Sequence, residues 1–268
     1  MGKRRPSGDG LVRKRADGRW EGRIVVGHKE DGKPIYRSVF AEKQSDLMPK
    51  LHELKDQYAG VELTEDSSIT LGEWLGRWLE EYKKPTLRPS TFAGYSKDIA
   101  NHILPYLGSK RITQLKTAEI QKHYNRLLES GRIQDNGKGK GLSNATVRGI
   151  HMILREALDS AVREGLIPKN PADGTSPPKI YRNEKQVLTK DQLETFMKLI
   201  EDDEEWYDFF YTEIITGMRQ GEICGLRWED FDREKRTLRV ARSVDFVNKE
   251  LVVGETKTED GKRTIYLP

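Results

Sequence analysis

The sequence predicts a multidomain α+β protein: a small three-stranded β-sheet with one helix, then a four-helix bundle, then a mainly α region that contains a β-hairpin. Short segments separated by Asp-Gly turns occupy residues 10–40, whereas apolar residues at helical spacing dominate residues 69–170. Both patterns recur in the final third of the chain. Acidic and proline-rich stretches between these regions are typical of linkers. The domains that we expect span residues 1–60, 66–170 and 185–268.

The first domain is predicted from its turns. Asp-Gly pairs at residues 17–18 and 31–32 separate three short strands, and Asp-Gly is a strong hairpin signal. A helix is expected from about Lys43 to Tyr58. Arginines fall on or beside the strands, and a β-sheet can lie in the major groove of DNA and read it with such side chains. A small folding module without DNA contact is the alternative.

Four helices are expected in the second domain, each with one apolar face. Thr70 begins the first with a capping box, Thr117 can cap the third and Ser143 can cap the fourth. Pro105 is expected to end the second helix, because proline lacks a backbone N–H. The tryptophans and tyrosines lie at helical spacing, so we assign most of them to the core and treat base stacking as the less favoured role.

The third domain begins with a capping box at Thr189 and a helix with one apolar face. A second helix, rich in aromatic and aliphatic residues, ends at a Thr-Gly turn, and Arg219 then begins a short third helix. The β segments that follow have turns at residues 248–249 and 260–261. An arginine fixed at such a junction presents five N–H donors in a rigid fork, which suits a phosphate gripped at two oxygens.

Positive charge is divided between two blocks. Residues 1–37 carry 11 Lys/Arg against 5 Asp/Glu, and residues 83–170 carry 16 against 7, although the net charge of the whole chain is only +4. Two basic blocks are what a protein with two polyanion contacts needs, so nucleic acid is the favoured partner. Solvated surface charge is the alternative.

Composition excludes several classes of protein and site. No apolar run is long enough to span a bilayer, and the basic N-terminus lacks the apolar core of a signal peptide. The one cysteine, Cys224, excludes an internal disulfide and a cysteine-based metal cluster. We therefore expect a polar protein of the reducing cytoplasm, with no membrane association, no metal and no cofactor.

The segment from Thr216 to Asp232 reads Thr-Gly-x-Arg-x-x-Glu-x-x-x-Leu-x-Trp-x-Asp-hydrophobic-Asp. It closely resembles the first catalytic-arginine motif of the tyrosine recombinases, the integrases of phages and conjugative transposons. The two preceding regions resemble the arm-site-binding domain and the SAM-like core-binding domain of such proteins. The resemblance implies that the last region is the first part of a mainly α catalytic domain with a β-hairpin.

This resemblance implies roles for particular residues. Phosphoryl transfer without a metal needs a nucleophile, cations that neutralise charge on the non-bridging oxygens, and an acid for the leaving oxygen. Arg219 would be the cation, Glu222 a supporting residue, and Lys257, at a hairpin tip, the general acid. Lys262 is a close rival for that last role. From the residues alone, an ordinary i,i+3 pair of Arg219 with Glu222 on a helix surface would be the expectation.

Other parts of the family pattern are missing from this sequence. No histidine follows Arg219, and the one later tyrosine, Tyr266, lies in an expected β segment and is not assigned as the nucleophile. We therefore expect a C-terminally truncated mobile-element recombinase, whose full form would act through a 3′-phosphotyrosyl intermediate and whose present form binds DNA without cleaving it. A DNA-binding regulator or competitor of recombination is the alternative. An RNA-binding protein is a weaker candidate, because no aromatic-rich RNA motif is present.

Double-stranded DNA is the expected partner, at arm-type sites through the first domain and at core-type sites through the second, with self-association on the DNA. The candidate DNA-binding residues are basic side chains beside the strands or off the apolar helix faces. They are Arg13, Arg15, Arg23 and Arg37 in the first domain and Lys97, Arg126, Lys140 and Arg148 in the second.

Overall fold

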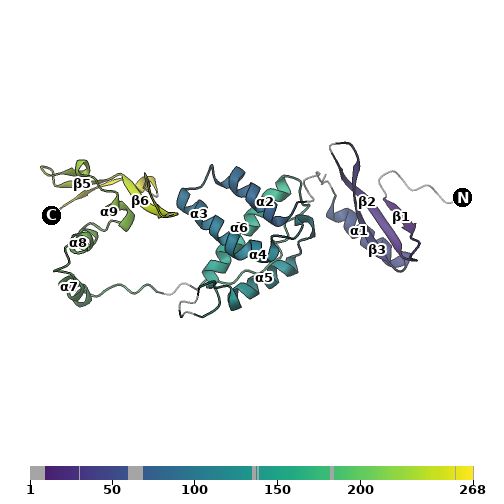
Figure 1. The fold of residues 1–268 in the computed structure, drawn as a ribbon, viewed down its shortest axis with the longest axis horizontal. Coiled ribbons are helices and arrows are strands. Elements are labelled where there is room, and N and C mark those ends of the chain that lie inside the picture. Colours follow the sequence, from purple (N-terminus) through teal and green to yellow (C-terminus); the bar gives the residue numbers. More distant parts are fainter. Residues whose placement is uncertain are drawn as a thin grey trace. The chain divides into compact units, whose positions relative to one another are not determined.

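A computed structural model of the chain describes residues 10–29, 31–59, 69–134, 137, 139–181, 184–256 and 258–267 (Figure 1). Its contacts divide the chain into two units. The first contains the described residues up to Thr86 together with Tyr95–Ile180, and the second contains Leu87–Gly94 and the described residues from Tyr181 onward. The three domain boundaries expected from the sequence remain a prediction.

The first unit begins with an antiparallel three-stranded sheet and one helix, which confirms the elements predicted for this region. The strand order is β1-β2-β3, and Leu51 of the helix packs against Ile24 and Val26 of the central strand in a buried core. Gly18 and Gly32 of the two Asp-Gly turns have φ of +84° and +78°, which is why glycine suits both positions. The bounds are β1 Leu11–Lys14, β2 Trp20–His28, β3 Pro34–Ala41 and α1 Gln44–Gln57.

A helical bundle follows, with the indole rings in its core. Trp74 donates from Nε1 to the carbonyl of Ala157 (2.8 Å), and Trp78 donates from Nε1 to Oγ of Ser160 (3.1 Å). Both rings are fully buried, which agrees with the core role predicted for them. The helical segments are α2 Leu71–Trp78, η2 Leu79–Lys83, α3 Pro89–Asp98, η3 Ile99–Ile103, α4 Leu104–Leu107, η4 Ile112–Gln114, α5 Thr117–Ser130 and α6 Asn144–Arg163.

Two expectations for the bundle are wrong in detail. Pro105 does not end the second helix, which continues from α3 through the π-helical η3 and on to Leu107. Pro105 lies in the first turn of α4, where no backbone N–H is needed for the helix. Thr117 is not the cap of α5: Lys116 is the N-cap, and its N–H donates to the carboxylate of Glu119 (3.1 Å). The capping boxes predicted at Thr70 and Thr189 and the Ser143 cap are confirmed.

Short helices and two small sheets make up the described part of the second unit. One sheet has the antiparallel order β4-β5-β8, and β6 and β7 form a separate hairpin. Asn248 and Lys249 both have positive φ, so a two-residue turn closes this hairpin at the predicted position. The bounds are α7 Lys190–Leu199, α8 Tyr207–Thr216, α9 Gln220–Cys224, η5 Trp228–Asp230, β4 Phe231–Asp232, β5 Thr237–Val240, β6 Arg242–Val247, β7 Glu250–Glu255, η6 Glu259–Gly261 and β8 Arg263–Tyr266.

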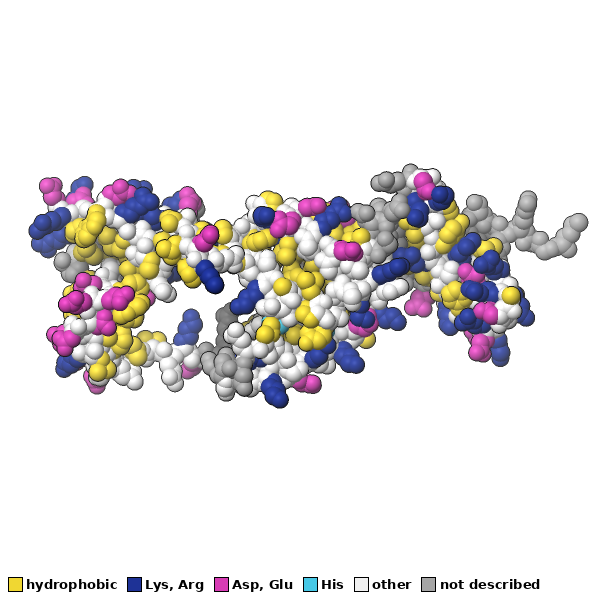
Figure 2. All heavy atoms as spheres, in the orientation of Figure 1, with side chains coloured by type: hydrophobic (Ala, Val, Ile, Leu, Met, Phe, Trp, Pro, Cys, Tyr) yellow, Lys and Arg dark blue, Asp and Glu magenta, His cyan; other side chains and the backbone are white. Residues whose placement is uncertain are grey.

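Helices α7 and α8, which the structure describes in full, contact each other through the rings of Phe196 and Phe210 but leave other apolar side chains exposed. Neither contains a buried residue, and Tyr211, Ile214 and Ile215 of α8 are exposed. Trp228, which follows α9, keeps 92% of its surface exposed. Figure 2 shows hydrophobic and acidic side chains intermixed over this part of the second unit. The small core of this unit is instead formed around Met218.

Candidate functional site

Arg219 lies at the junction between α8 and α9. Helix α8 ends at Gly217, whose φ of +62° lies in the left-handed region that favours glycine. The next residue, Met218, is 2% exposed and packs with Leu238 and Val240 of β5. Arg219 is itself the N-cap of α9 and has an extended backbone. The chain is therefore fixed immediately before and after the arginine.

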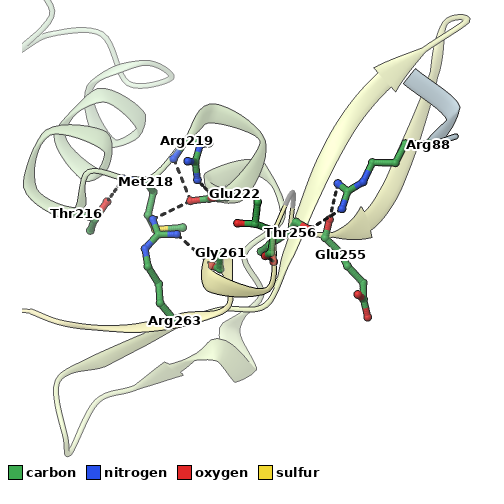
Figure 3. A network of polar contacts seen from close by, with 10 residues as sticks. Arg88, Thr216, Met218, Arg219, Glu222, Glu255, Thr256, Gly261 and Arg263 are labelled. Atoms are coloured by element: carbon green, nitrogen blue, oxygen red, sulfur yellow. Dashed lines mark hydrogen bonds and ion pairs between the residues drawn. The ribbon is translucent and has the colours of Figure 1, made fainter. Parts of the chain in front are cut away.

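A buried carboxylate holds this arginine in place. Glu222 accepts hydrogen bonds from the backbone N–H of Arg219 (3.2 Å) and from its Nη1 (2.8 Å). Arg263 of β8 donates from Nη2 to Oε2 of the same carboxylate at 2.9 Å (Figure 3). Because the Glu222 side chain is 3% exposed, the acid at the centre of this network is buried, unlike the acid of the ordinary surface pair that local spacing suggests.

The network keeps Glu222 ionised. Burial raises the pKa of the Glu222 carboxyl, but the hydrogen bonds from Arg263 and Arg219 outweigh burial and lower the pKa to about 2. The Arg219 side chain remains 69% exposed. Its Nε and Nη2 make no hydrogen bond to the described residues, so these donors remain for a ligand. Arg219, Glu222 and Arg263 together form what we call the Arg219 corner. In it, Glu222 binds the backbone N–H and one guanidinium nitrogen of Arg219, and most of the Arg219 side chain is exposed.

Close packing explains the glycine in the helix that follows Arg219. A Cβ at Gly221 would lie 2.8 Å from the carbonyl oxygen of Val244 and 2.5 Å from Oγ of Ser243, both on β6. Any larger residue would push α9 away from this strand. The local sequence around Gly221 does not reveal this close approach of β6, because Ser243 and Val244 lie more than 20 residues further along the chain.

A hollow of about 700 Å³ opens beside Arg219. It is lined by Arg219 and residues of α9, by residues of β6, by Leu251 of β7 and by Arg88, Ser90 and Thr91, all of which belong to the second unit. In the same unit, the guanidinium of Arg88 donates to the backbone carbonyls of Glu255 (3.3 Å) and Thr256 (2.7 Å), as Figure 3 shows. Arg219, whose side chain is 69% exposed, is one of the residues that line this hollow.

A second buried acid lies in η5, beyond the C-terminal end of α9. Asp230 is 6% exposed and accepts hydrogen bonds from the backbone N–H of Arg227 (2.9 Å) and from Nη1 of Arg242. Arg242 also donates to the carbonyl of Gly225 at 3.3 Å, which ties β6 to the end of α9. Sequence reasoning named neither Arg242 nor Arg263. They lie 12 and 41 residues from their acids, and no local pattern marks either pairing.

The assignment of the general acid to Lys257 or Lys262 remains a prediction. Lys257 lies outside the described residues. Asn248 and Lys249 form the tip of the β6–β7 hairpin, and β7 ends at Glu255. Lys262 lies just before β8, and its Nζ donates to the carboxylate of Glu255 at 3.2 Å.

Tyr266 has the position that the sequence predicts. It lies in β8, pairs with Thr237 of β5 and is 81% exposed. Its place in a paired strand agrees with leaving it out of the catalytic assignment.

The sheet arginines do not share one face. Side chains alternate along a strand, and cross-strand partners point to the same side. Arg13 and Arg23 therefore lie on the face opposite the buried Ile24, whereas Arg37 is the register partner of Ile24 itself. On the outer face, Nε of Arg13 donates to the carboxylate of Glu21 at 2.8 Å. The structure thus separates Arg37 from the others.

Two of these arginines lie against aromatic rings. The guanidinium of Arg23 is 4.0 Å from the ring centroid of Tyr36, and that of Arg15 is 5.5 Å from the ring centroid of Phe40. Both rings are exposed. An arginine held over a ring loses less side-chain freedom when it binds a ligand, so the outer face combines positive charge with ordered side chains.

The four candidates in the helical bundle also differ. Lys97, Lys140 and Arg148 are exposed. Arg126 is half-buried and donates from Nη2 to Nδ1 of the buried His123 at 2.8 Å. Arg126 therefore has a structural role inside the bundle, and the other three are the side chains open to solvent.

Two features that would indicate another kind of protein, a metal site and a membrane-spanning helix, are absent from the described residues. No three His, Cys, Asp or Glu side chains there gather where they could hold a metal ion. Among the helices described, none is both long and apolar enough to cross a bilayer.

Two parts of the chain match known families. Residues 70–128 match the phage integrase N-terminal SAM-like domain, and residues 186–265 match the phage integrase family. The first match begins at the N-cap of α2 and ends within α5. The second contains the whole Arg219–Glu222–Arg263 corner.

The chain is also similar to curated proteins over most of its length. It is 27% identical over 244 residues to an integrase of Saccharopolyspora erythraea, a match that covers 90% of this chain and 53% of that protein. It is 26% identical over 261 residues to a XerC-like tyrosine recombinase of Caldanaerobacter subterraneus subsp. tengcongensis, covering 91% and 64%. The chain thus spans between about half and two thirds of the length of these relatives.

Solved structures agree with these matches. The Tn1549 transposon integrase in complex with a circular intermediate DNA matches with a TM-score of 0.62 and 25% identity, over 75% of this chain and 62% of that chain. A lambda integrase dimer bound to a COC′ core site shares the fold, with a TM-score of 0.55 and 20% identity, over 95% and 68%. The motif around Arg219, the family matches and these likenesses lead to one conclusion: the chain belongs to the tyrosine recombinase family of phage-type integrases.

Proposed function

We propose that this chain is part of a site-specific DNA integrase of a mobile element, in which Arg219 binds the phosphate at which a DNA strand is exchanged. The relatives described as integrases support the class. One observation supports the role of Arg219: its guanidinium is held by the buried Glu222 yet remains 69% exposed. The whole protein would act through a 3′-phosphotyrosyl intermediate.

The chemistry of the corner suits a phosphate in strand exchange. Negative charge grows on the non-bridging oxygens when the phosphate is attacked, and donors that are already in place stabilise it without reorganisation. Arg219 is such a donor, because its backbone and Nη1 are both bonded to Glu222. In this scheme Glu222 supports Arg219, and Lys257 is the general acid for the leaving oxygen, with Lys262 as its rival.

We propose two DNA-binding faces in the same protein. The outer face of the β1–β3 sheet, with Arg13, Arg15 and Arg23, would contact arm-type sites. Lys97, Lys140 and Arg148 of the bundle would contact core-type sites. Residues 1–60, 66–170 and 185–268 would be the corresponding arm-binding, core-binding and partial catalytic domains. Arg37 and Arg126 have weaker support, because Arg37 shares the core side of its sheet and Arg126 is engaged with a buried histidine.

Self-association on DNA is part of the proposal. The lambda integrase relative forms a dimer on a core site and a tetramer on a Holliday junction. Binding of successive copies of this chain to one duplex, followed by analytical ultracentrifugation, tests whether it shares that property. A single bound copy at saturation would contradict it.

The role of Arg219 is tested by neutralising one phosphate at a time. A duplex recognised by the chain is first selected from a random-sequence library, and each phosphate is then replaced by an uncharged methylphosphonate. We expect one substitution to weaken binding of the wild-type chain by about 10- to 100-fold, the worth of a charge-assisted hydrogen bond, and to have no effect on Arg219→Ala. Arg227→Ala is the matched control, because its side chain is 58% exposed and lies just beyond α9. An equal effect in all three chains would refute the assignment.

The alternative function, a DNA-binding competitor without catalysis, makes the same prediction for the covalent chemistry of this chain as the partial integrase does. We expect Tyr266 to form no covalent adduct with a nicked suicide substrate, because in β8 it is paired with Thr237 of β5. A protein–DNA band on a denaturing gel that disappears in Tyr266→Phe would show that Tyr266 is a nucleophile after all.

A further inference from the structure

Arg263 connects two parts of the second unit that are far apart in sequence. It is the first residue of β8, and its backbone is fixed by pairing with Val240 of β5. Its Nη2 donates to Glu222 at 2.9 Å, and its Nη1 donates to the carbonyl of Gly261 at 3.2 Å. One guanidinium therefore bonds both the Arg219 corner and the end of the loop between β7 and β8.

That loop has internal bonds of its own. The N–H of Gly261 donates to the carbonyl of Thr258 (3.0 Å), which also accepts from Oγ1 of the buried Thr256 (2.9 Å). A Cβ at Gly261 would lie 2.8 Å from Cβ of Thr256, so the two ends of the loop touch. A bond from Arg263 to Gly261 thus acts on the described part of the loop between β7 and β8 (Thr256 and residues 258–261), called the β7–β8 loop below.

We propose that Arg263 is a positioning residue that keeps the β7–β8 loop in register with Arg219, through its shared bond to Glu222. The inference rests on the proposed function, in which Arg219 binds the phosphate and Lys257 or its rival Lys262, which adjoin these loop residues in sequence, is the general acid for the leaving oxygen. Arg263 does not line the hollow beside Arg219, so it acts through other residues and is not itself a catalytic group.

The shape of the guanidinium explains why an arginine is needed here. Two nitrogens of one planar, rigid fork point at two different oxygens, and a lysine offers a single flexible donor centre. A lysine at position 263 could reach the carboxylate or the carbonyl, but its one nitrogen would not fix the angle between them. The two bonds would then no longer hold the loop and the corner at a fixed separation.

Amide hydrogen exchange of the full chain tests the link without DNA. In Glu222→Gln, Arg263 loses its charged partner, and we expect the Gly261 N–H to exchange about tenfold faster or more, the fold-change for a weakened charge-assisted bond. Arg263→Lys should have the same effect on Gly261. Arg242→Lys is the matched control, since Arg242 also bonds one buried carboxylate and one carbonyl, but at the other end of α9. It should leave Gly261 unchanged.

The effect of Arg263 on Glu222 is measured as the pKa of the Glu222 carboxyl, by ¹³C NMR. Replacement of Arg263 by Gln should raise the Glu222 pKa from about 2 by roughly 1 to 3, the effect of losing one adjacent arginine. Unchanged exchange at Gly261 in Glu222→Gln, in a chain whose other amides keep their protection, would overturn the inference, because it would show that the corner and the loop are independent.

A DNA measurement separates this inference from the proposed function. Suppose that a methylphosphonate at one phosphate weakens DNA binding by the wild-type chain. The loss of affinity caused by that substitution should then be smaller in Arg263→Lys and unchanged in Arg242→Lys. This loss of affinity is called the penalty below. Loss of protection at Gly261 without any change in that penalty would overturn the positioning role. If the wild-type chain has no such phosphate, the proposed function fails, and the exchange data alone decide whether Arg263 links the loop to Glu222.

Discussion

Replacement of Glu222 by Gln should change how the stability of the second unit depends on pH. The folded pKa of Glu222, about 2, lies below its ordinary value of 4.5. The unfolded chain therefore takes up the proton first on acidification, and the stabilisation by the carboxylate is fully present above about pH 4.5. It is lost as the pH falls from about 4.5 to about 2. A glutamine, which has no charge to lose, should abolish this dependence.

The size of the effect follows from the two pKa values. A fall from 4.5 to about 2 corresponds to about 3 kcal/mol, at about 1.4 kcal/mol for each pKa unit. One of the two arginine partners is 69% exposed, and water screens its share of the attraction. We therefore expect Glu222→Gln to cost about 2–3 kcal/mol at neutral pH and to leave a nearly flat profile below pH 4.5.

Hydrogen exchange at the amides of α9, measured at several pH values, reports this free energy locally. Glu229→Gln is the matched control, because Glu229 also binds arginines but its side chain is 66% exposed. The wild type and this control should lose protection together on acidification, beyond the intrinsic change in exchange rate. If amide protection in Glu222→Gln falls with pH as it does in the wild type and in Glu229→Gln, the carboxylate does not stabilise the corner and the reasoning is refuted.

Three further predictions concern other parts of the chain. Burial lowers the pKa of His123 to about 4, below its ordinary value of 6.5, so its protonation should cost the bundle about 3 kcal/mol as the pH falls from 6.5 to 4. Urea titrations followed by circular dichroism should show a smaller loss in His123→Gln, in which the burial that lowers the pKa of His102 and His151 still acts. Gly221→Ala should destabilise the second unit by about 1–3 kcal/mol through overpacking. Gly149→Ala, at an open helical position, should instead stabilise the bundle by about 0.5–1 kcal/mol. Equal shifts in the thermal unfolding temperature of the two variants would contradict the packing argument. A fragment of residues 1–60 should bind duplex DNA at low salt and release it steeply as salt rises, and no binding at low salt would remove the arm-binding assignment.

Local signals in the sequence predicted most of the local structure. The Asp-Gly turns, the Thr70 and Thr189 capping boxes and the order of strands and helices are confirmed. Each depends on residues within a few positions of one another. Pro105 misled for the same reason: its effect on a helix depends on where in the turn it falls, and the π-helical segment before it places it at the start of α4.

Features that depend on register or on distant contacts were not predictable in this way. Arg37 was grouped with Arg13 because both lie on strands, yet the register of β2 and β3 places Arg37 beside the core residue Ile24. A shift of one residue in a strand moves a side chain to the other face, and composition does not reveal it. Arg263 and Glu222 are 41 residues apart, so their bond appears only when β8 is folded against α9.

Arg219 must be held in position and must also keep a positive charge for a phosphate. The pairing of two arginines with one acid meets both requirements. A carboxylate that binds an arginine holds it still, but a one-to-one pair cancels the charge that a phosphate needs. Arg263 supplies a second positive charge to Glu222, so the corner as a whole carries a net charge of +1. The Arg263 side chain is 31% exposed and that of Arg219 is 69% exposed, so the uncompensated charge is presented to solvent at Arg219. Loss of Arg263 would leave a neutral Arg219–Glu222 pair, which would be well positioned but weakly attractive to a phosphate.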